Sequence, residues 1–355
     1  MKNLRHCSLH PALKVPQILI VCLFGLSPFY AISAPLPAGQ PQDKLAIQKI
    51  VDDAVDSTKK SINPKGMCVI VANPQTGKIL ALNGDAARFL TEPVSTFKAV
   101  TIIAALEEGK ITPETKIDCE SGAFKIGNFT LKDHIPLGEL QYDGILAKSS
   151  NIGTTKIAFL LEDQDFYDYA RRFGFGEKTG IDVPREFPGI LHPPSKWGEQ
   201  SKARMAIGQG IAVTPIQIAM ATCALANGGK LMRPLLGQEN PHLVRQICSE
   251  KTANLVKKAL ESNVIDGGAS LAKVEGIDVG GMTGTAQAVT PEGKYSPDQY
   301  VTMFSGFFPV EHPKYVVLVV IDQAKLPPNI NYGGLIAAPI FAEIAKKISS
   351  LPAHY

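Results

Sequence analysis

The chain lacks the patterns that mark several large classes of protein. Only 19% of its residues are charged, and no basic stripe with interleaved aromatic side chains occurs, so no nucleic-acid partner is expected. Its cysteines and histidines are not spaced as metal ligands, so neither a metal nor another cofactor is expected. A Gly-x-Ser-x-Gly elbow is also missing, which leaves a conventional hydrolase triad without support.

Charge of one sign is not in large excess either. The chain has 36 basic and 33 acidic residues, and Lys2, Arg5 and Lys14 all precede the first acidic residue, Asp43. The rest of the chain is therefore balanced, with 33 residues of each sign. A balanced body has no field that would attract a polyanion.

Long uncharged runs are equally scarce, and the one that occurs lies near the start of the chain. It covers residues 15–34, about the length that a bilayer requires, although Pro16 and Pro28 would interrupt a helix. Basic residues before the run and small residues after it have the layout of an export signal, with cleavage after Ser33. Residues 1–34 are thus expected to be a cleaved signal peptide or a retained membrane anchor, and the remainder is expected to be exported.

Cysteine is too sparse to predict a disulfide framework. Two of the six cysteines lie in this leader. The other four have no paired spacing and are Cys68, Cys119, Cys223 and Cys248. We expect isolated apolar thiols, with pairing in an oxidising compartment as the alternative.

Hydrophobic patterns place strands at both ends of the chain and helices in the middle. The expected elements are a helix at 43–59, a hairpin of strands at 67–72 and 78–82, helices at 95–108 and 214–227, strands at 279–288, 301–308 and 315–321, and a closing helix at 335–349. They predict an α/β (α+β) fold, in which helices flank one antiparallel sheet, a mostly α lobe is inserted, and a cleft lies between the lobes. Three regions are expected: the leader 1–34, a linker and first helix at 35–63, and one domain at 64–355.

The first candidate for chemistry is the pair of Ser95 and Lys98 in Ser-Thr-Phe-Lys. On a helix the two side chains lie on one face, one turn apart, so the geometry permits a hydrogen bond between them, and the catalytic interpretation expects this contact. A serine hydroxyl is a weak nucleophile unless a base takes its proton, and lysine is a base only when neutral. An ordinary lysine must lose about 3 pKa units, or about 4 kcal/mol, to be half neutral at pH 7. Taken alone, the pair also fits a helix start with a capping serine and a solvated lysine.

Further segments in a fixed order change that interpretation. The segments are Thr91-Glu-Pro-Val-Ser-Thr-Phe-Lys98, Lys148-Ser-Ser-Asn-Ile-Gly153, Phe173-Gly-Phe-Gly176 with Thr179-Gly-Ile-Asp182, Ala206-Ile-Gly-Gln-Gly-Ile-Ala-Val-Thr-Pro-Ile-Gln217, Ala224-Leu-Ala-Asn-Gly-Gly229 and Gly281-Met-Thr-Gly-Thr-Ala-Gln287. From about Pro64 to its C-terminus, the chain resembles the transpeptidase domain of class B penicillin-binding proteins, the monofunctional enzymes of elongation and division.

The resemblance implies four catalytic residues. Ser95 would attack a D-alanyl-D-alanine stem peptide and hold the acyl group until an amine or water takes it. Lys98 would be its base, Ser149 would relay a proton to the leaving group, and Asn151 would orient the substrate. Without the other motifs, Ser149 and Asn151 would read as a helix cap.

The resemblance also implies a substrate-binding strand. Thr283 would bind the substrate carboxylate, next to Gly284. The backbone N–H groups of Thr285 and Ser95 would form the oxyanion hole, where one lost donor costs about 3 kcal/mol. Without the other motifs, the two threonines would read as β-branched strand residues.

One position of this third motif departs from the family, because Met282 stands where the family has lysine. Two ammonium groups about 5 Å apart at an effective dielectric near 20 repel by about 3 kcal/mol. Methionine removes that repulsion, so Lys98 is expected to be protonated more often and acylation to be slower. Lys294, in the loop beyond the strand, is a candidate replacement cation. A second departure is length, since only about thirty residues separate the leader from the first expected strand.

Three functions remain open on this sequence. The first is a D-Ala-D-Ala transpeptidase or carboxypeptidase of cell-wall synthesis, either periplasmic or anchored to the inner membrane and facing the periplasm. Its partners would be peptidoglycan stem peptides, β-lactams and other wall-synthesis or division proteins, with membrane contact only through the N-terminal segment. The second is a catalytically impaired relative that acts as a binding or scaffolding protein. The third is a β-lactamase or β-lactam sensor.

Overall fold

The computed structural model describes residues 42–290, 294–327 and 330–352. The expected leader, 1–34, and nearly all of the expected linker lie outside these ranges. Within them, no helix is both long and apolar enough to cross a bilayer.

Helices and strands follow the predicted order. The α-helices are α1 Gln42–Ile62, α2 Lys98–Glu107, α3 Tyr142–Ala147, α4 Asn151–Phe159, α5 Asp163–Arg172, α6 Ser201–Ala206, α7 Pro215–Ala226, α8 Glu250–Asp266 and α9 Gly333–Ser349. The strands are β1 Gly66–Ala72, β2 Ile79–Asn83, β3 Ile117–Asp118, β4 Ala123–Ile126, β5 Phe129–Lys132, β6 Glu139–Leu140, β7 Lys230–Met232, β8 Leu243–Gln246, β9 Gly280–Val289, β10 Tyr295–Phe308 and β11 Tyr315–Asp322. The 3-10 helices are η1 Val94–Phe97, η2 Glu120–Gly122, η3 Pro194–Lys196 and η4 Ser270–Ala272.

The main sheet joins the two ends of the chain, as the strand patterns predict. Its five strands run in the order β2-β1-β11-β10-β9, and every neighbouring pair is antiparallel. In its centre Val69 lies opposite Val319, which pairs the first strand with the last. The predicted antiparallel sheet is confirmed, and β9, which carries the third motif, lies at one edge.

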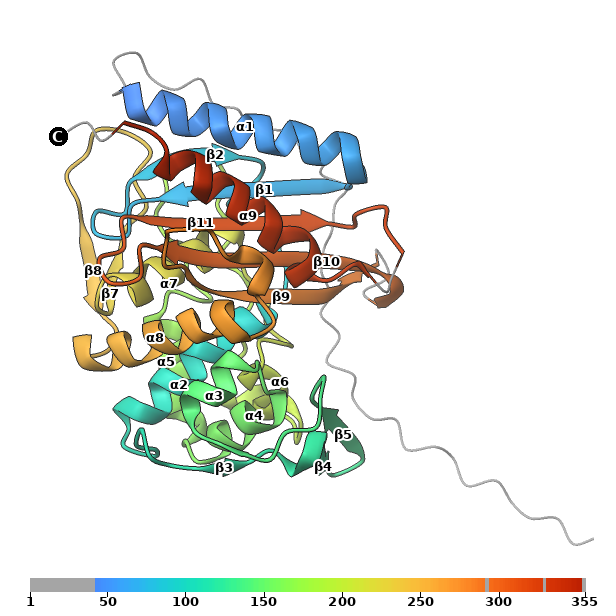
Figure 1. Ribbon diagram of the computed structural model, residues 1–355. Helices are drawn as coiled ribbons and strands as arrows, with labels where there is room; N and C mark the ends of the chain where they lie inside the picture. The colour runs from blue at the N-terminus through green and yellow to red at the C-terminus, as the bar shows by residue number, and fades with distance from the viewer. Residues whose placement is uncertain (1–41, 291–293, 328–329, 353–355) are drawn as a thin grey trace, which may run out of the picture.

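Helices cover both faces of this sheet and create two cores. In Figure 1, α1 and α9 lie on one face, while α7 and α8 lie on the other. Phe304 of β10 packs edge-on against Phe341 of α9, with ring centroids 4.6 Å apart. On the opposite side every residue of α7 is buried, as the alanine-rich pattern predicts. Because both faces are covered, β1 is buried at each position, which explains its unbroken apolar sequence.

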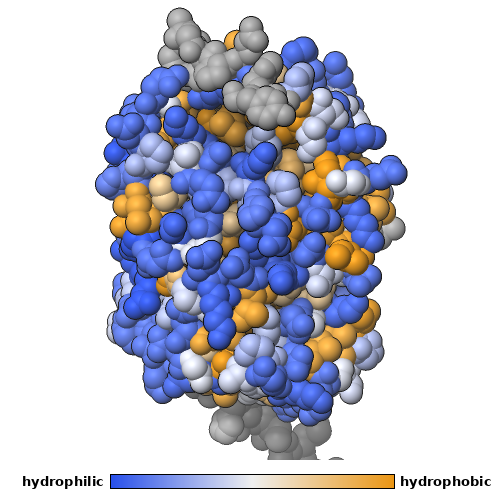
Figure 2. All heavy atoms as spheres, turned by 60° about the vertical axis from the view of Figure 1, so that its left-hand side comes forward, coloured by the Kyte–Doolittle hydropathy of each residue, from blue (hydrophilic) through white to orange (hydrophobic). Residues whose placement is uncertain are grey.

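A second lobe is inserted between α2 and α7. It carries α3 to α6 and the short strands β3 to β6, and it lies below the sheet in Figure 1. The predicted mostly α lobe is therefore confirmed. On the face shown in Figure 2, apolar residues form separate patches among hydrophilic ones.

The four cysteines of the described residues are buried and free. This arrangement agrees with the predicted isolated thiols. Burial raises the pKa of the Cys223 thiol, which makes that side chain unreactive.

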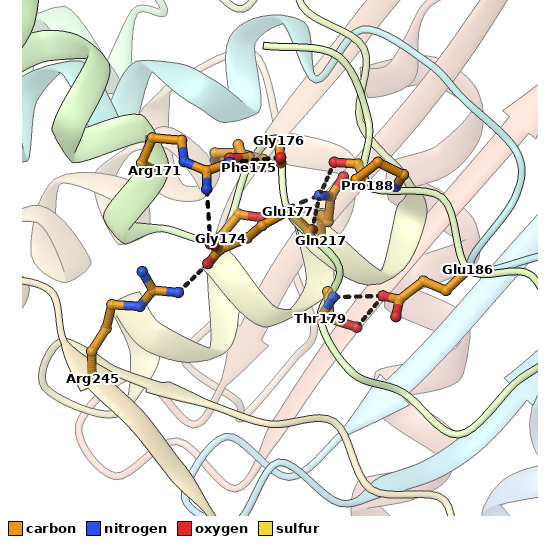
Figure 3. A network of polar contacts seen from close by, with 10 residues as sticks. All are labelled: Arg171, Gly174, Phe175, Gly176, Glu177, Thr179, Glu186, Pro188, Gln217 and Arg245. Carbon is orange, nitrogen blue, oxygen red and sulfur yellow. Dashed lines mark hydrogen bonds and ion pairs between the residues drawn. The ribbon is translucent and has the colours of Figure 1, made fainter.

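Gln217 of α7 connects the inserted lobe to the buried helix (Figure 3). Its side-chain nitrogen donates to the carbonyls of Gly174, Glu177 and Pro188 at 3.1, 2.8 and 2.9 Å. Its side-chain oxygen accepts from the N–H of Thr214 at 2.9 Å. One buried amide therefore satisfies backbone groups from two loops and from the start of α7.

Charged residues extend the same network (Figure 3). The Glu177 carboxylate pairs with Arg171 at 3.2 Å and also with Arg245. Glu186 accepts from both the N–H and the hydroxyl of Thr179, each at 2.6 Å. The network holds the segment that includes Phe173-Gly-Phe-Gly176, so this motif is structural.

Phe175 connects this network to the first motif through an aromatic contact. Its ring centroid lies 5.4 Å from that of Phe97, the residue that precedes α2, and Phe97 also packs against Phe166. Phe97 is fully buried. The inserted lobe thus fixes the start of α2.

Candidate active site

The turn that carries Ser95 is a 3-10 helix. The sequence predicted that this turn would be the first turn of an α-helix, and that prediction is wrong. Val94 begins it with a φ of 42°, a conformation that a β-branched side chain adopts rarely. The N–H of Val94 donates to the carbonyl of Gly208 at 3.0 Å. A Cβ at Gly208, whose φ is +73°, would lie 2.2 Å from the Val94 carbonyl oxygen. Only glycine allows this approach. The Gly-Gln-Gly segment, residues 208–210, therefore sets the shape of the turn at 94–97 that carries the candidate nucleophile Ser95, here named the nucleophile turn.

A buried acid ties the same turn to β10. The Glu92 carboxylate accepts from the N–H of Gly210 at 2.8 Å and from the hydroxyl of Tyr295 at 2.7 Å. Burial raises the pKa of Glu92. The residues before Ser95 are thus held both by the Gly-Gln-Gly segment and by the start of a sheet strand.

Ser95 and Lys98 are neighbours along the backbone, but their side chains are not hydrogen-bonded. The N–H of Lys98 donates to the carbonyl of Ser95, and the Lys98 side chain is fully buried. Its amine donates to the carbonyl of Ser149 at 2.5 Å and lies 2.9 Å from the Ser149 hydroxyl. The half-buried Ser95 hydroxyl makes no hydrogen bond within the described part of the chain. The expected direct hydrogen bond is absent because Ser149 supplies two acceptors to the amine.

The environment of Lys98 favours its neutral form. Burial lowers the pKa of Lys98 to about 7, and the negative charge of Asp133 opposes this shift. Desolvation alone therefore achieves the reduction that a catalytic base requires, because it disfavours the charged amine. A second cation beside Lys98 is not needed for this.

The second motif forms a left-handed turn followed by α4. Ser149 has a φ of 53°, and Ser150 caps the helix by accepting from the N–H of Gly153 at 2.9 Å. The side-chain nitrogen of Asn151 donates to the Lys132 carbonyl at 2.8 Å. The amide oxygen of Asn151 makes no hydrogen bond with the described residues, so it can receive one from a ligand.

Helix α8 supports this turn from the other side. Asn263, which is fully buried, donates to the carbonyls of Leu146 and Ala147 at 3.1 and 2.8 Å. A Cβ at Gly267 would lie 2.1 Å from the Ala147 oxygen. The close approach of α8 therefore fixes the chain immediately before Lys148 and Ser149.

The third motif lies beside the nucleophile turn. A Cβ at Gly284 would lie 2.8 Å from a methyl carbon of Val94, so β9 and the turn are in direct contact. Thr283 and Thr285 are half-buried, and the hydroxyl of Thr285 accepts from the N–H of Gly333 at 3.0 Å. Since β9 is an edge strand, part of its backbone lies outside the hydrogen-bonded ladder. The structure thus brings the nucleophile turn, Lys98, Ser149 and β9 together.

Met282 and Lys294 lie in different surroundings. Met282 is 3% exposed and belongs to the apolar core that the sheet shares with α2 and α7. Lys294 is exposed, next to Tyr295, which pairs with Val289. Val289 is seven residues beyond Met282, or about 23 Å along a strand. Lys294 therefore does not replace the missing lysine at Met282.

The sequence reasoning missed three contributors to this site. Glu92 and Gly208 lie inside recognised motifs, but their roles depend on a contact between segments far apart in the chain. Asp133 lies in no recognised motif, although its carboxylate accepts hydrogen bonds from the second motif. A lone acid after a short strand carries no local signal of such a contact.

Comparison with known proteins agrees with this geometry. The family model described as "Penicillin binding protein transpeptidase domain" matches residues 67–346. Stage V sporulation protein D of Bacillus subtilis is 35% identical over 341 residues, which cover 86% of this chain and 52% of that protein. The probable peptidoglycan D,D-transpeptidase PenA of Neisseria flavescens is 31% identical and is covered over 79% of its length, against 84% of this chain. Several of the curated relatives are about twice as long as the region that matches.

Solved structures give the same result. The transpeptidase domain of Burkholderia pseudomallei penicillin-binding protein 3 has a TM-score of 0.80 and 29% identity, covering 85% of this chain and 92% of that one. Penicillin-binding protein 3 of Mycobacterium tuberculosis, solved with aztreonam, has a TM-score of 0.75 and 27% identity, covering 84% of this chain and 75% of that one. The chain therefore belongs to the penicillin-binding protein transpeptidase domain family.

Proposed function

We propose that the chain is a peptidoglycan D,D-transpeptidase of cell-wall synthesis that forms an acyl-enzyme on Ser95. The observation that carries this proposal is the buried Lys98, whose pKa is lowered to about 7 and whose amine lies 2.9 Å from the Ser149 hydroxyl. A neutral amine that follows a free serine hydroxyl by one turn can act as its base. The relatives named as D,D-transpeptidases support the same activity.

The reaction begins with attack of the Ser95 oxygen on the carbonyl of the penultimate D-alanine. Lys98 takes the hydroxyl proton, for which its flexible stem must bring the amine from Ser149 to Ser95. The N–H groups of Ser95 and Thr285 stabilise the resulting oxyanion. Thr283 binds the terminal carboxylate, and Asn151 offers its amide oxygen to the peptide.

Collapse of the tetrahedral intermediate breaks the carbon–nitrogen bond. The departing D-alanine amine receives a proton from Lys98 through the Ser149 hydroxyl, and the peptide remains as an ester on Ser95. An acceptor amine, or water in a carboxypeptidase reaction, then attacks this ester and restores the serine. A β-lactam acylates Ser95 in the same way, but its ring nitrogen stays attached to the acyl group.

We place the protein in the exported compartment, with its catalytic domain on the periplasmic side of the inner membrane. The basic and apolar leader supports this placement. Peptidoglycan stem peptides and β-lactams are the proposed ligands, and other wall-synthesis or division proteins are the proposed partners.

Intact mass spectrometry with benzylpenicillin tests the proposal. We expect the protein to gain the mass of one penicillin, and peptide mapping to place the adduct on Ser95. Absence of an adduct at high penicillin concentration would contradict the proposal. It would favour a catalytically impaired binding protein, the alternative that Met282 in the apolar core supports. Rapid turnover of nitrocefin would instead indicate a β-lactamase.

Met282→Lys separates two effects of the missing amine. Because the pKa of Lys98 is already about 7, a further decrease can raise its neutral fraction at pH 7 only about twofold. A gain of this kind should disappear at pH 9, where Lys98 is neutral in both proteins. A gain from attraction of the substrate carboxylate should persist at both pH values. The measurement is the rate of acylation by a fluorescent penicillin for both proteins at pH 7 and pH 9. If Met282→Lys and the wild type react at the same rate at each pH, Met282 does not limit acylation.

A further inference from the structure

Asp133 is an acid outside the recognised motifs that binds the second motif. It follows β5 directly, and one of its carboxylate oxygens accepts from the N–H groups of Asn151 at 2.5 Å and Ile152 at 3.1 Å. The other oxygen accepts from the Ser150 hydroxyl at 2.6 Å. One carboxylate thus receives hydrogen bonds from three consecutive residues at the start of α4.

These three residues directly follow Ser149, which holds the amine of Lys98. The left-handed conformation of Ser149 presents both its carbonyl and its hydroxyl to that amine. Any movement of the turn would therefore move both acceptors of Lys98. The neighbouring Lys132 carbonyl holds the side chain of Asn151 as well, so the end of β5 fixes four donor groups of the motif.

The negative charge of Asp133 also favours the charged form of the Lys98 amine. The other charged groups around the site bind other partners. On the α4 side, Lys148 donates to the Asp266 carbonyl at 2.9 Å, and Lys156 pairs with Glu120 at 2.5 Å. On the β9 side, the motif residues 281–287 include no ionisable group. Before the nucleophile turn, Glu92 is bound by Gly210 and Tyr295, with Arg204 in electrostatic reach.

We propose that Asp133 is a positioning residue for the acylation of Ser95. Its carboxylate holds the Ser149 turn in place against Lys98, and its charge balances the ammonium that forms when Lys98 takes the proton of Ser95. This inference rests on the function proposed above. It assigns Asp133 no contact with the substrate, only an effect through Ser149 and Lys98.

Two substitutions separate the positioning and charge effects. Asp133→Asn retains an oxygen for the N–H groups of α4 but removes the charge, so the midpoint of the acylation rate against pH should shift to lower pH. Asp133→Ala releases the turn, and the rate on the high-pH plateau should fall roughly 10- to 100-fold, as expected for a displaced reacting group. Asp143→Asn is the matched control, because the Asp143 side chain is exposed and accepts from the N–H of Gly144 near the start of α3, and it makes no hydrogen bond with the second motif within the described residues.

The measurement is acylation by a fluorescent penicillin across pH 5 to 10 for the wild type and all three variants. If both Asp133 variants melt at lower temperature but keep the wild-type midpoint and plateau, Asp133 is only a helix cap and the inference is overturned. If the alanine variant does not fold, the midpoint of the asparagine variant decides.

A second readout does not depend on the proposed function. The titration of the Lys98 amine can be followed by NMR, with Lys98→Met to assign its signal, in the wild type and in Asp133→Asn. A lower midpoint in the variant supports the inference, and an unchanged midpoint overturns it. A wild type that is never acylated but shows this shift would contradict the proposed function alone.

Discussion

Replacing Lys98 with methionine should slow the acylation of Ser95 by a penicillin about 1,000-fold, within the range that a general base contributes. Methionine fills a similar volume but takes no proton, so the hydroxyl must attack without a base. The second-order rate constant from a fluorescent penicillin measures the loss, with Ser95→Ala as the zero reference. The matched control is Lys110→Met, because Lys110 is exposed just beyond the same helix.

The pH dependence gives this prediction a second part. In the wild type the acylation rate should rise about tenfold per pH unit below pH 7 and level off above it, because the neutral form of Lys98 is the base and its pKa is about 7. In Lys98→Met this rise should be absent. A variant within tenfold of the wild type at pH 8 would show that Lys98 is not the base.

Lys98→Met should slow acylation but increase the free energy of unfolding. The ordinary pKa of lysine is 10.5, and the folded pKa of Lys98 is about 7. Between these values the unfolded chain binds more protons, so the stability of the wild type rises as the pH rises. Well below pH 7 both states are protonated, and the wild type bears the full cost of a buried charge; at pH 7, where about half of the folded protein is protonated, most of this cost remains. Lys98→Met should therefore be more stable than the wild type at pH 7, and this advantage should shrink towards pH 10.

Replacing Gln217 with leucine should lower the free energy of unfolding by about 3 to 5 kcal/mol. Leucine has a similar size but can neither donate nor accept, so three loop carbonyls lose a donor and the N–H of Thr214 loses its acceptor. An unsatisfied buried polar group costs about 1 to 3 kcal/mol, and water can compensate for some of these groups. Urea unfolding measures the change.

The control for this substitution is Gln164→Leu on α5. Gln164 is exposed, and among the described residues it donates only to Asp168, one turn away. A surface substitution of this kind changes stability by about 0.5 kcal/mol or less. If Gln217→Leu costs no more than the control, the loops do not depend on this amide.

Local patterns predicted the sheet and most helices because they depend on residues close together in the chain. The apolar run of β1, the hairpin around residues 309–313 and the buried face of α7 follow from hydrophobic periodicity. The first turn of the predicted helix at 95–108 did not follow from it. Contact with Gly208 places Val94 in a left-handed conformation, and the turn that carries Ser95 becomes a 3-10 helix.

The candidate site divides in the same way. The sequence by itself determined which side chains we propose for the chemistry, because Ser95, Lys98, Ser149 and the threonines of β9 lie in motifs that can be read along the chain. Only the tertiary structure decided that Lys98 contacts Ser149, that its amine is desolvated, and that Asp133 binds the second motif. A pKa is set by the dielectric and the charges that surround a group in space. These surroundings exist only after distant segments have packed together.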